Sequence, residues 1–475
     1  MNGRFRRRGL PVLLAVGGVA AIGSAFVIDA AGAQDVATGT TAAAGVTPVF
    51  SPRRVPELLA RPIAASRLAA KLDPILAAAA GDTCLVVADG ATIIDRNGGT
   101  PLAPASNQKL LVGETALAVL GADTTFTTRF AAAGPIGSDG TLKGPLWMIG
   151  GGDPVIDTAS YQRTSRHGVS PHTSMESIAD DLVAKGLRKV DGGITGDESR
   201  YDTVRDVPSW PDRYRSDNQV GPLSGLSVND AKGYPAGEAT GPVHPATDPA
   251  AYAAGVLIDL LRARGIEVTG GPASGKAPGG LTTIAEVPSL PVSGIVGEML
   301  TFSDNNTAEL LLKELGRTRD EPTTQGGIEV VNDHLRKLRL DTEGQVMVDG
   351  SGLDPTNRVT CRLLDGVLQT DGPQSALAGG LPIAGKTGTL DDRFRGSPAA
   401  GKVRAKTGTL RDVSALSGWV TTDRGAELSF AYVLNTPNRR VGGADERRAE
   451  QLTEAMLSYP DAPDPTTIGP VTIPR

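Results

Sequence analysis

A serine and a lysine, Ser106 and Lys109, stand three positions apart at the start of an apolar run. Residues i and i+3 of a helix share one face, so the hydroxyl and the amine would point the same way. The positive end of the helix dipole would favour an alkoxide on Ser106, and a neutral Lys109 could accept the serine proton. This pair could therefore perform serine acyl transfer without histidine or metal. The alternative is a helix-capping serine followed by a solvated lysine.

Two later motifs could complete such a site, Ser303-Asp304-Asn305 and Lys406-Thr407-Gly408. Ser303 could relay a proton between Lys109 and a leaving amine, and Asn305 could hold Lys109 and donate to a substrate carbonyl. Burial and a nearby cation both lower a lysine pKa, and Lys406 is the candidate cation. The Ser-Asp-Asn stretch alone could simply cap the helix that follows it. The three motifs in this order are far more specific than any one of them.

The Lys-Thr-Gly motif occurs twice, at 386–388 and at 406–408, and Thr-Leu follows each copy. The second copy leads into a strand-like apolar segment, whereas the first leads into a charged loop. A cleft role requires a strand edge that pairs with an extended peptide, and a glycine that allows close approach. We therefore assign Lys406, Thr407, Gly408 and Thr409 to the site and Lys386 to a loop.

Several elements must position these residues. A helix is expected over 52–72, a hairpin over 84–95, helices near 306–315 and 327–338, strands at 413–421 and 428–435, and a last helix at 445–457. Between 126 and 290 short strands alternate with turns, and helices are expected at 175–185 and 249–264. These patterns predict a catalytic domain made of 52–125 plus 291–457, an inserted accessory domain at 126–290, and a C-terminal tail at 458–475 that is poorly ordered from Pro460 on.

The N-terminus predicts export. Four arginines precede an apolar stretch from about Leu10 to Ile28, and Ala31-Gly32-Ala33 resembles a cleavage site. We expect a signal peptide at 1–33 and a flexible spacer at 34–51. The apolar stretch is nearly long enough to span a bilayer, so membrane association through an uncleaved segment is the alternative. The protein would then act in the periplasm or cell envelope, outside the cytoplasmic membrane.

Composition excludes other functions. The net charge is −6, and no dense Lys/Arg stripe follows the first ten residues, which argues against a nucleic-acid partner. The four histidines lack the spacing of a metal site, so neither metal nor cofactor is expected. A cluster at Arg205, Trp210, Arg213 and Tyr214 could contact glycan or peptide, but a partly buried cluster is favoured. Cys84 and Cys361 could form a disulfide or remain two buried thiols.

The ordered motifs resemble those of penicillin-binding proteins and serine β-lactamases. The long separation of Ser106 from Ser303 leaves room for an insert. The chain thus resembles the three-domain D-alanyl-D-alanine carboxypeptidase/endopeptidases, the low-molecular-mass penicillin-binding proteins of peptidase family S13. Stretches that carry this resemblance are 102–110, 152–154, 303–310, 349–353 and 398–410. Lys386 departs from the family, whose members commonly have Gly-Thr-Leu there without a full Lys-Thr-Gly.

The resemblance implies an α/β (α+β) fold: a transpeptidase/β-lactamase-like catalytic domain with helices on an antiparallel sheet, and a large, mostly-β insertion. It implies that Ser106 attacks the penultimate D-alanine of peptidoglycan stem peptides, with Lys109 as base and Ser303 as relay. The amides of Ser106 and Thr409 would hold the oxyanion. Lys406 with Thr407 or Thr409 would recognise the terminal carboxylate, and penicillin would acylate Ser106. A β-lactamase or esterase, or a non-catalytic envelope-binding protein of the same fold, are the alternatives.

Overall fold

The computed structural model describes residues 47, 51–233 and 243–470. The predicted signal peptide lies outside the described residues, as does nearly all of the predicted spacer. Residues 55–469 form one compact unit, which contains all three candidate motifs. Within the described part of the chain, no helix is long and apolar enough to cross a membrane.

One sheet joins the two ends of this unit. Its five antiparallel strands have the order β15-β16-β17-β1-β2, with bounds Val403–Leu410, Val413–Thr421, Glu427–Asn435, Asp82–Ala88 and Thr92–Arg96. The expected hairpins β1–β2 and β16–β17 are both present. β1 pairs with β17 along its whole length, so strands from distant parts of the sequence are neighbours in the middle of the sheet. β15 is an edge strand, as the interpretation of the second Lys-Thr-Gly required.

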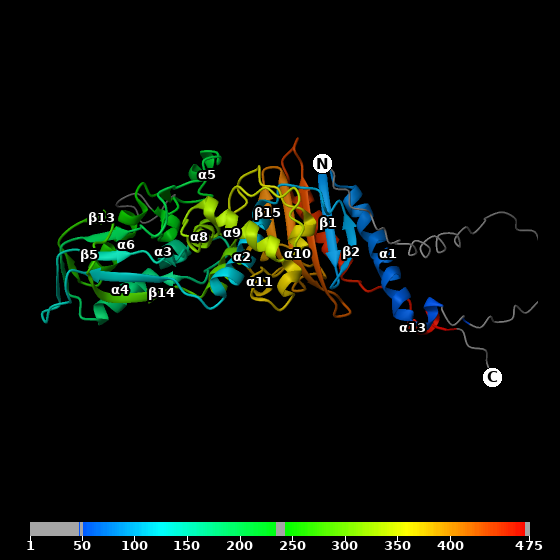
Figure 1. The fold of residues 1–475 in the computed structure, drawn as a ribbon, viewed down its shortest axis with the longest axis horizontal. Helices are drawn as coiled ribbons and strands as arrows, with labels where there is room; N and C mark the ends of the chain where they lie inside the picture. Colours follow the sequence, from blue (N-terminus) through cyan, green and yellow to red (C-terminus); the bar gives the residue numbers. More distant parts are fainter. Residues whose placement is uncertain (1–46, 48–50, 234–242, 471–475) are drawn as a thin grey trace, which may run out of the picture. The chain divides into compact units, whose positions relative to one another are not determined.

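Strand alternation divides the packing into two layers. Leu85 and Val87 of β1 face a core shared with α1 (Pro56–Ala77) and α12 (Gly443–Met456). Cys84 and Val86 face the opposite core, which α2, α7, α8, α9, α10 and α11 cover. Their bounds are Lys109–Ala116, Val292–Phe302, Asn305–Arg317, Thr324–Lys337, Cys361–Asp371 and Ala376–Gly379. Figure 1 shows α1 on one side of the sheet and α10 on the other. Helices on an antiparallel sheet confirm the expected fold class.

The insert has its own core. A mixed sheet has the order β13-β9-β5-β3-β14, and a parallel sheet the order β12-β8-β4. α4 (Met175–Ala184) and α6 (Pro249–Arg262) pack against these sheets, as Figure 1 shows. The strands are β3 Thr127–Ala132, β4 Thr141–Lys143, β5 Leu146–Ile149, β8 Lys189–Asp191, β9 Ile194–Asp197, β12 Glu267–Val268, β13 Pro272–Ser274 and β14 Thr282–Pro288. The domain boundaries at 125/126 and 290/291 stay a prediction.

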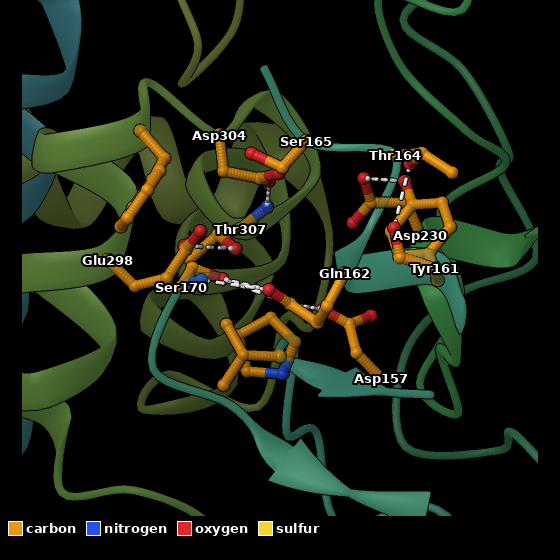
Figure 2. A pocket seen from close by; sticks show the side chains of 13 residues that line it. Asp157, Tyr161, Gln162, Thr164, Ser165, Ser170, Asp230, Glu298, Asp304 and Thr307 are labelled. Carbon is orange, nitrogen blue, oxygen red and sulfur yellow. Dashed lines mark hydrogen bonds between the residues drawn. The ribbon is translucent and has the colours of Figure 1, made fainter. Parts of the chain in front are cut away.

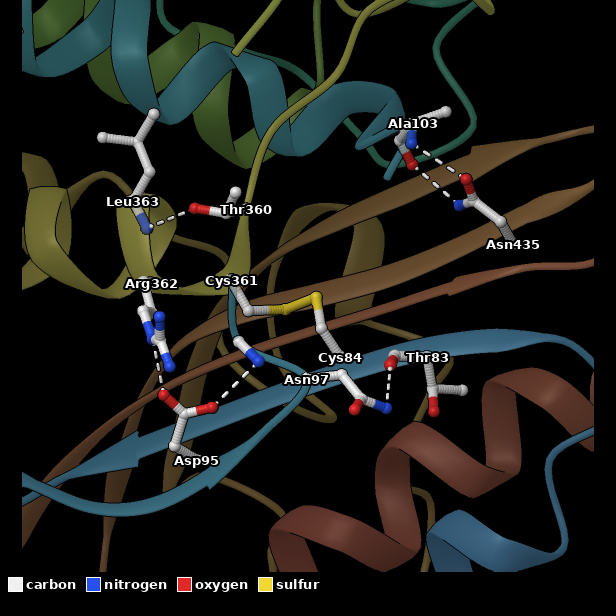
Figure 3. The surroundings of a disulfide bond; sticks show 11 residues. Thr83, Cys84, Asp95, Asn97, Ala103, Thr360, Cys361, Arg362, Leu363 and Asn435 are labelled. Carbon is white, nitrogen blue, oxygen red and sulfur yellow. Dashed lines mark hydrogen bonds and ion pairs between the residues drawn. A yellow bond between two sulfur atoms is a disulfide. The ribbon is translucent and has the colours of Figure 1, made fainter. Parts of the chain in front are cut away.

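A disulfide joins Cys84 in β1 to Cys361 at the start of α10, and it closes a loop of 277 residues. The sequence left this pairing open. Figure 3 shows Thr360 capping α10 beside the bond, where the Leu363 amide donates to its hydroxyl at 3.1 Å. The disulfide therefore fixes the beginning of α10 against the sheet.

Two expectations about the ends of the chain were wrong, the start of the first helix and the poor order of the tail. α1 begins at Pro56 rather than at 52. Part of the tail beyond Pro460 is ordered, because α13 (Pro465–Ile468) contacts α1. Asp461 forms an ion pair with Arg67 of α1 at 2.9 Å, so the tail is held by packing and charge together. Proline content alone had suggested disorder.

Candidate active site

Ser106 and Lys109 meet as their spacing predicted, although Ser106 precedes the α-helix. A 3-10 turn, η2 (Ala105–Gln108), carries Ser106, and α2 begins at Lys109. The Lys109 Nζ lies 3.0 Å from the Ser106 Oγ. Ala105, the residue before the serine, has φ 48, a left-handed conformation that costs a residue with a side chain about 1–3 kcal/mol. The Ser106 hydroxyl is thus presented from a strained turn that the surrounding structure holds.

Lys109 is completely buried and has two further acceptors. Its Nζ donates to the Asn305 Oδ1 at 2.7 Å and to the Ser351 carbonyl oxygen at 2.8 Å. Burial lowers the pKa of Lys109 to about 8, although the surrounding carboxylates, Asp304 foremost, act to raise it. The amine can therefore lose its charge near neutral pH while two acceptors fix its orientation.

Ser303 and Lys406 form a second pair on the same site. The Lys406 Nζ donates to the Ser303 Oγ at 2.8 Å and to the Thr407 carbonyl oxygen at 2.9 Å. Ser303 ends α7 in a left-handed conformation with φ 63. Burial, and then repulsion from Lys109, hold the pKa of Lys406 well below its usual value. Burial, one of the two expected causes, is the main cause of the lowered pKa for both lysines, and repulsion between the two charges is seen as the effect of Lys109 on Lys406.

An open cleft of about 660 Å³ runs along β15. Of the expected site residues, Ser106, Ser303, Asn305, Thr407 and Thr409 line it, while Lys109 and Lys406 lie buried behind it. By strand alternation, Gly408 points away from the cleft. A Cβ there would lie 2.7 Å from the Asn107 Nδ2, so this glycine allows β15 to approach the Ser106 turn rather than a substrate.

The outer edge of β15 offers backbone donors. The Ala405 amide donates to the Pro382 carbonyl at 3.1 Å, on the side away from β16. Amides two residues apart on a strand point the same way, and the β15–β16 register is unbroken through Thr409. The Thr407 and Thr409 amides therefore face outward, as the expected oxyanion role of Thr409 requires.

The insert reaches the site through Gln219. Its carbonyl oxygen accepts a hydrogen bond from the Asn305 Nδ2 at 2.6 Å. Asn305 is therefore held from both sides, with its oxygen on Lys109 and its nitrogen on the insert. One of the two hydrogens on the Asn305 Nδ2 is used in the bond to Gln219, so the other one would donate to a substrate carbonyl.

Sequence reasoning missed the residues that aim the Ser351 carbonyl. The Glu309 carboxylate accepts from the Gly350 amide at 3.0 Å and from the Ser351 amide at 2.7 Å, deep in the core. We had interpreted the Asp349-Gly-Ser-Gly stretch only as a turn against the catalytic domain. The contact with Lys109 uses the backbone oxygen of residue 351, so the residue type at this position could not predict the contact. Glu309 lies on α8 one turn beyond Asn305, and this spacing was the available clue.

A cavity of about 160 Å³ lies behind the Ser-Asp-Asn motif and is rich in carboxylates. Figure 2 shows Asp157, Asp230, Glu298 and Asp304 around it. Burial raises the pKa of Asp304 to about 6, and it holds the pKa values of Asp157 and Glu298 well above normal. Within the described residues, no group of three or more His, Cys, Asp or Glu side chains is arranged to hold a metal ion.

The aromatic cluster of the insert is internal, as favoured. Trp210 and Tyr214 are buried. The Trp210 Nε1 donates to the Asp349 carboxylate at 2.8 Å, and the Tyr214 hydroxyl donates to the Leu353 carbonyl at 2.9 Å. These contacts hold the insert against the loop that carries Ser351.

Comparison with known proteins agrees with this arrangement. The family model described as "D-Ala-D-Ala carboxypeptidase 3 (S13) family" matches residues 65–236 and 232–457. A D-alanyl-D-alanine carboxypeptidase of Actinomadura sp. (strain R39) is 30% identical over 440 residues, covering 76% of this chain and 79% of that protein. The carboxypeptidase DacB of Mycolicibacterium smegmatis is 31% identical over 438 residues, covering 90% and 91%.

Among solved structures, penicillin binding protein 4 (dacB) of Haemophilus influenzae has the same fold, with a TM-score of 0.65 and 21% identity. The match covers 83% of this chain and 98% of that protein. The family match includes the sheet, the insert and the three motifs. The two relatives align with this chain over most of their own length. The chain therefore belongs to the D-Ala-D-Ala carboxypeptidase 3 (S13) family.

Proposed function

We propose that this protein is a serine DD-peptidase that hydrolyses peptidoglycan stem peptides through an acyl-enzyme on Ser106. The observation that carries the proposal is the set of partners around the Lys109 nitrogen. A neutral amine has two hydrogens and one lone pair. Asn305 and Ser351 accept the two hydrogens, at 2.7 and 2.8 Å, so the lone pair faces the Ser106 hydroxyl 3.0 Å away. Lys109 is thus oriented as a base for this serine.

Acylation would proceed in two proton transfers. The Ser106 oxygen attacks the carbonyl carbon of the penultimate D-alanine while its proton passes to Lys109. The amides of Ser106 and Thr409 stabilise the oxyanion, at about 3–4 kcal/mol per donor in other serine hydrolases. The C–N bond then breaks, and the proton that Lys109 accepted passes through Ser303 to the leaving amine, which leaves Lys109 neutral again; Lys406 contacts Ser303 at 2.8 Å. Water attacks the resulting ester and frees Ser106.

The cleft wall suits a peptide that ends in a carboxylate. The outward amides of β15 can pair with an extended substrate, and the Thr407 and Thr409 side chains line the cleft beside them. Lys406 is buried, so it acts on Ser303 and on the local charge rather than as a direct carboxylate ligand. β-Lactams carry a carboxylate as this substrate does, and they offer a strained ring amide in place of the peptide bond. The Haemophilus influenzae protein has been solved in complex with a β-lactam, and we extend that binding to this chain.

Two substrates fit the chemistry, a free D-Ala-D-Ala terminus and a D-Ala-meso-diaminopimelate cross-link. The fold is shared with a predatory peptidoglycan endopeptidase of Bdellovibrio bacteriovorus, with a TM-score of 0.53 and 19% identity, which supports testing both. Both substrates are outside the cytoplasmic membrane, consistent with export by residues 1–33.

The test uses penicillin and purified muropeptides. A fluorescent penicillin should label the wild-type protein at Ser106, located by mass spectrometry, and should not label Ser106→Ala. Loss of one D-alanine from pentapeptide stems would identify a carboxypeptidase, and conversion of cross-linked dimers to monomers an endopeptidase. An acyl-enzyme that turns over within seconds would instead support a β-lactamase. A folded wild-type protein without label would support a non-catalytic binding protein.

A further inference from the structure

The first Lys-Thr-Gly-Thr-Leu repeat, residues 386–390, has no assigned role, yet one of its residues reaches the active-site cleft. The repeat lies in the loop between α11 and β15. Its last three residues form the short 3-10 helix η5 (Gly388–Leu390). Lys386 is exposed, whereas Thr389 lines the cleft beside Thr407. The Thr407 hydroxyl donates to the Thr389 Oγ1 at 2.8 Å. The first repeat therefore contributes the Thr389 hydroxyl to the wall that Thr407 and Thr409 of the second repeat also line.

The conformation of this loop is fixed at several points. Gly388 has φ 53, and a Cβ there would lie 2.1 Å from the Thr301 carbonyl oxygen, so only glycine fits. The Thr387 hydroxyl accepts from the Ile383 amide at 2.9 Å. Leu390 is buried in the core that the sheet shares with α1 and α12. The loop thus holds Thr389 in place, with a side chain that is neither exposed nor buried.

The two arginines and the histidine that line the cleft each contact a carboxylate, and the His167 Nδ1 lies 3.2 Å from the Asp391 Oδ2. Arg166 forms an ion pair with Asp392 at 2.5 Å, and Arg393 forms one with Glu450 at 2.9 Å. Lys406 is bound to Ser303 and has a lowered pKa. A substrate carboxylate at this wall would therefore depend on neutral donors.

We propose that Thr389 is a specificity-determining residue that binds the substrate's C-terminal carboxylate together with Thr407. This inference rests on the function proposed above. Two hydroxyls 2.8 Å apart can each donate to one oxygen of a carboxylate, exchanging their mutual hydrogen bond for two bonds to a charged acceptor. The first repeat thus serves the site through Thr389, while its lysine does not.

The test compares Thr389→Val, which keeps the shape of the side chain, with Thr389→Ser, which keeps the hydroxyl. Lys386→Ala is the matched control from the same loop. The probes are benzylpenicillin and its methyl ester, which lacks the carboxylate. The readout is the second-order rate constant of acylation for each probe, together with the melting temperature of each variant.

We expect Thr389→Val to slow acylation by benzylpenicillin about 10- to 100-fold, the usual loss for one hydrogen bond to a charged group. Acylation by the methyl ester should slow by a smaller factor than acylation by benzylpenicillin, because an ester carbonyl is a neutral and weaker acceptor than a carboxylate. Thr389→Ser and Lys386→Ala should behave like the wild type. Equal slowing of both probes, or no slowing of either, would overturn the role of Thr389. If the wild type itself is not acylated, the proposed function fails instead.

Discussion

Raising the pH from 6 to 9 should accelerate acylation of Ser106, because only the neutral form of Lys109 can accept its proton. Burial places the pKa of Lys109 at about 8. The neutral fraction then rises from about 1% at pH 6 to about 50% at pH 8 and about 90% at pH 9. The second-order rate constant for benzylpenicillin should therefore rise about 90-fold and level off above pH 9.

The midpoint of this profile separates Lys109 from the acids around it. The pKa of Asp304 is raised to about 6 and that of Glu309 to about 7. A single midpoint near 6, or a rate that is constant from pH 6 to 9, would refute Lys109 as the base. Circular dichroism across the same range checks that the fold does not change.

Glu309→Gln sharpens the same test. The glutamine oxygen can still accept from the Gly350 and Ser351 amides, so the Ser351 carbonyl should keep its position. The substitution removes a negative charge that raises the pKa of Lys109. Because Glu309 is mostly ionised at pH 8, the midpoint should move to lower pH. A midpoint that stays in place or moves upward would contradict the electrostatic explanation.

Lys406→Ala should reduce acylation by benzylpenicillin at least about 100-fold, as expected for loss of a proton-transfer partner. Lys386→Ala should leave the acylation rate near normal. The reverse result would mean that the first Lys-Thr-Gly copy, not the second, belongs to the active site. Replacing both Cys84 and Cys361 by alanine should lower the free energy of unfolding by about 5 kcal/mol, since the disulfide closes a loop of 277 residues. Urea unfolding of the double variant against the wild type measures this loss, and equal midpoints would contradict it.

Local patterns in the sequence predicted much of the fold. Hairpins, amphipathic helices and the spacing of Ser106 from Lys109 depend on near neighbours, and all appear in the structure. The pairing of β1 with β17 could not be predicted in this way, because nothing local to either strand encodes the other. The helix boundary at Ser106 was also missed, since a 3-10 turn and an α-helix place i and i+3 similarly.

The candidate site was predictable as far as it depends on side-chain type. Ser303, Asn305 and Lys406 lie together as the motifs implied. The contributions of Ser351 and Gln219 are carbonyl oxygens, which every residue has, so no residue type identifies them. Burial as the main cause of both lysine pKa shifts likewise emerges only from packing.

The support that the insert gives to Asn305 limits attempts to engineer a smaller enzyme. Deleting residues 126–290 would remove Gln219 from the Asn305 amide and Trp210 from the Asp349 carboxylate. It would also remove Arg200, which binds Glu314 with two nitrogens at 2.7 and 2.8 Å. The deletion would leave the Glu314 carboxylate without its ion-pair partner, and it would take from Asp349 one of the donors that hold it. A truncated version would need redesigned residues at all three contacts before its serine could be expected to react.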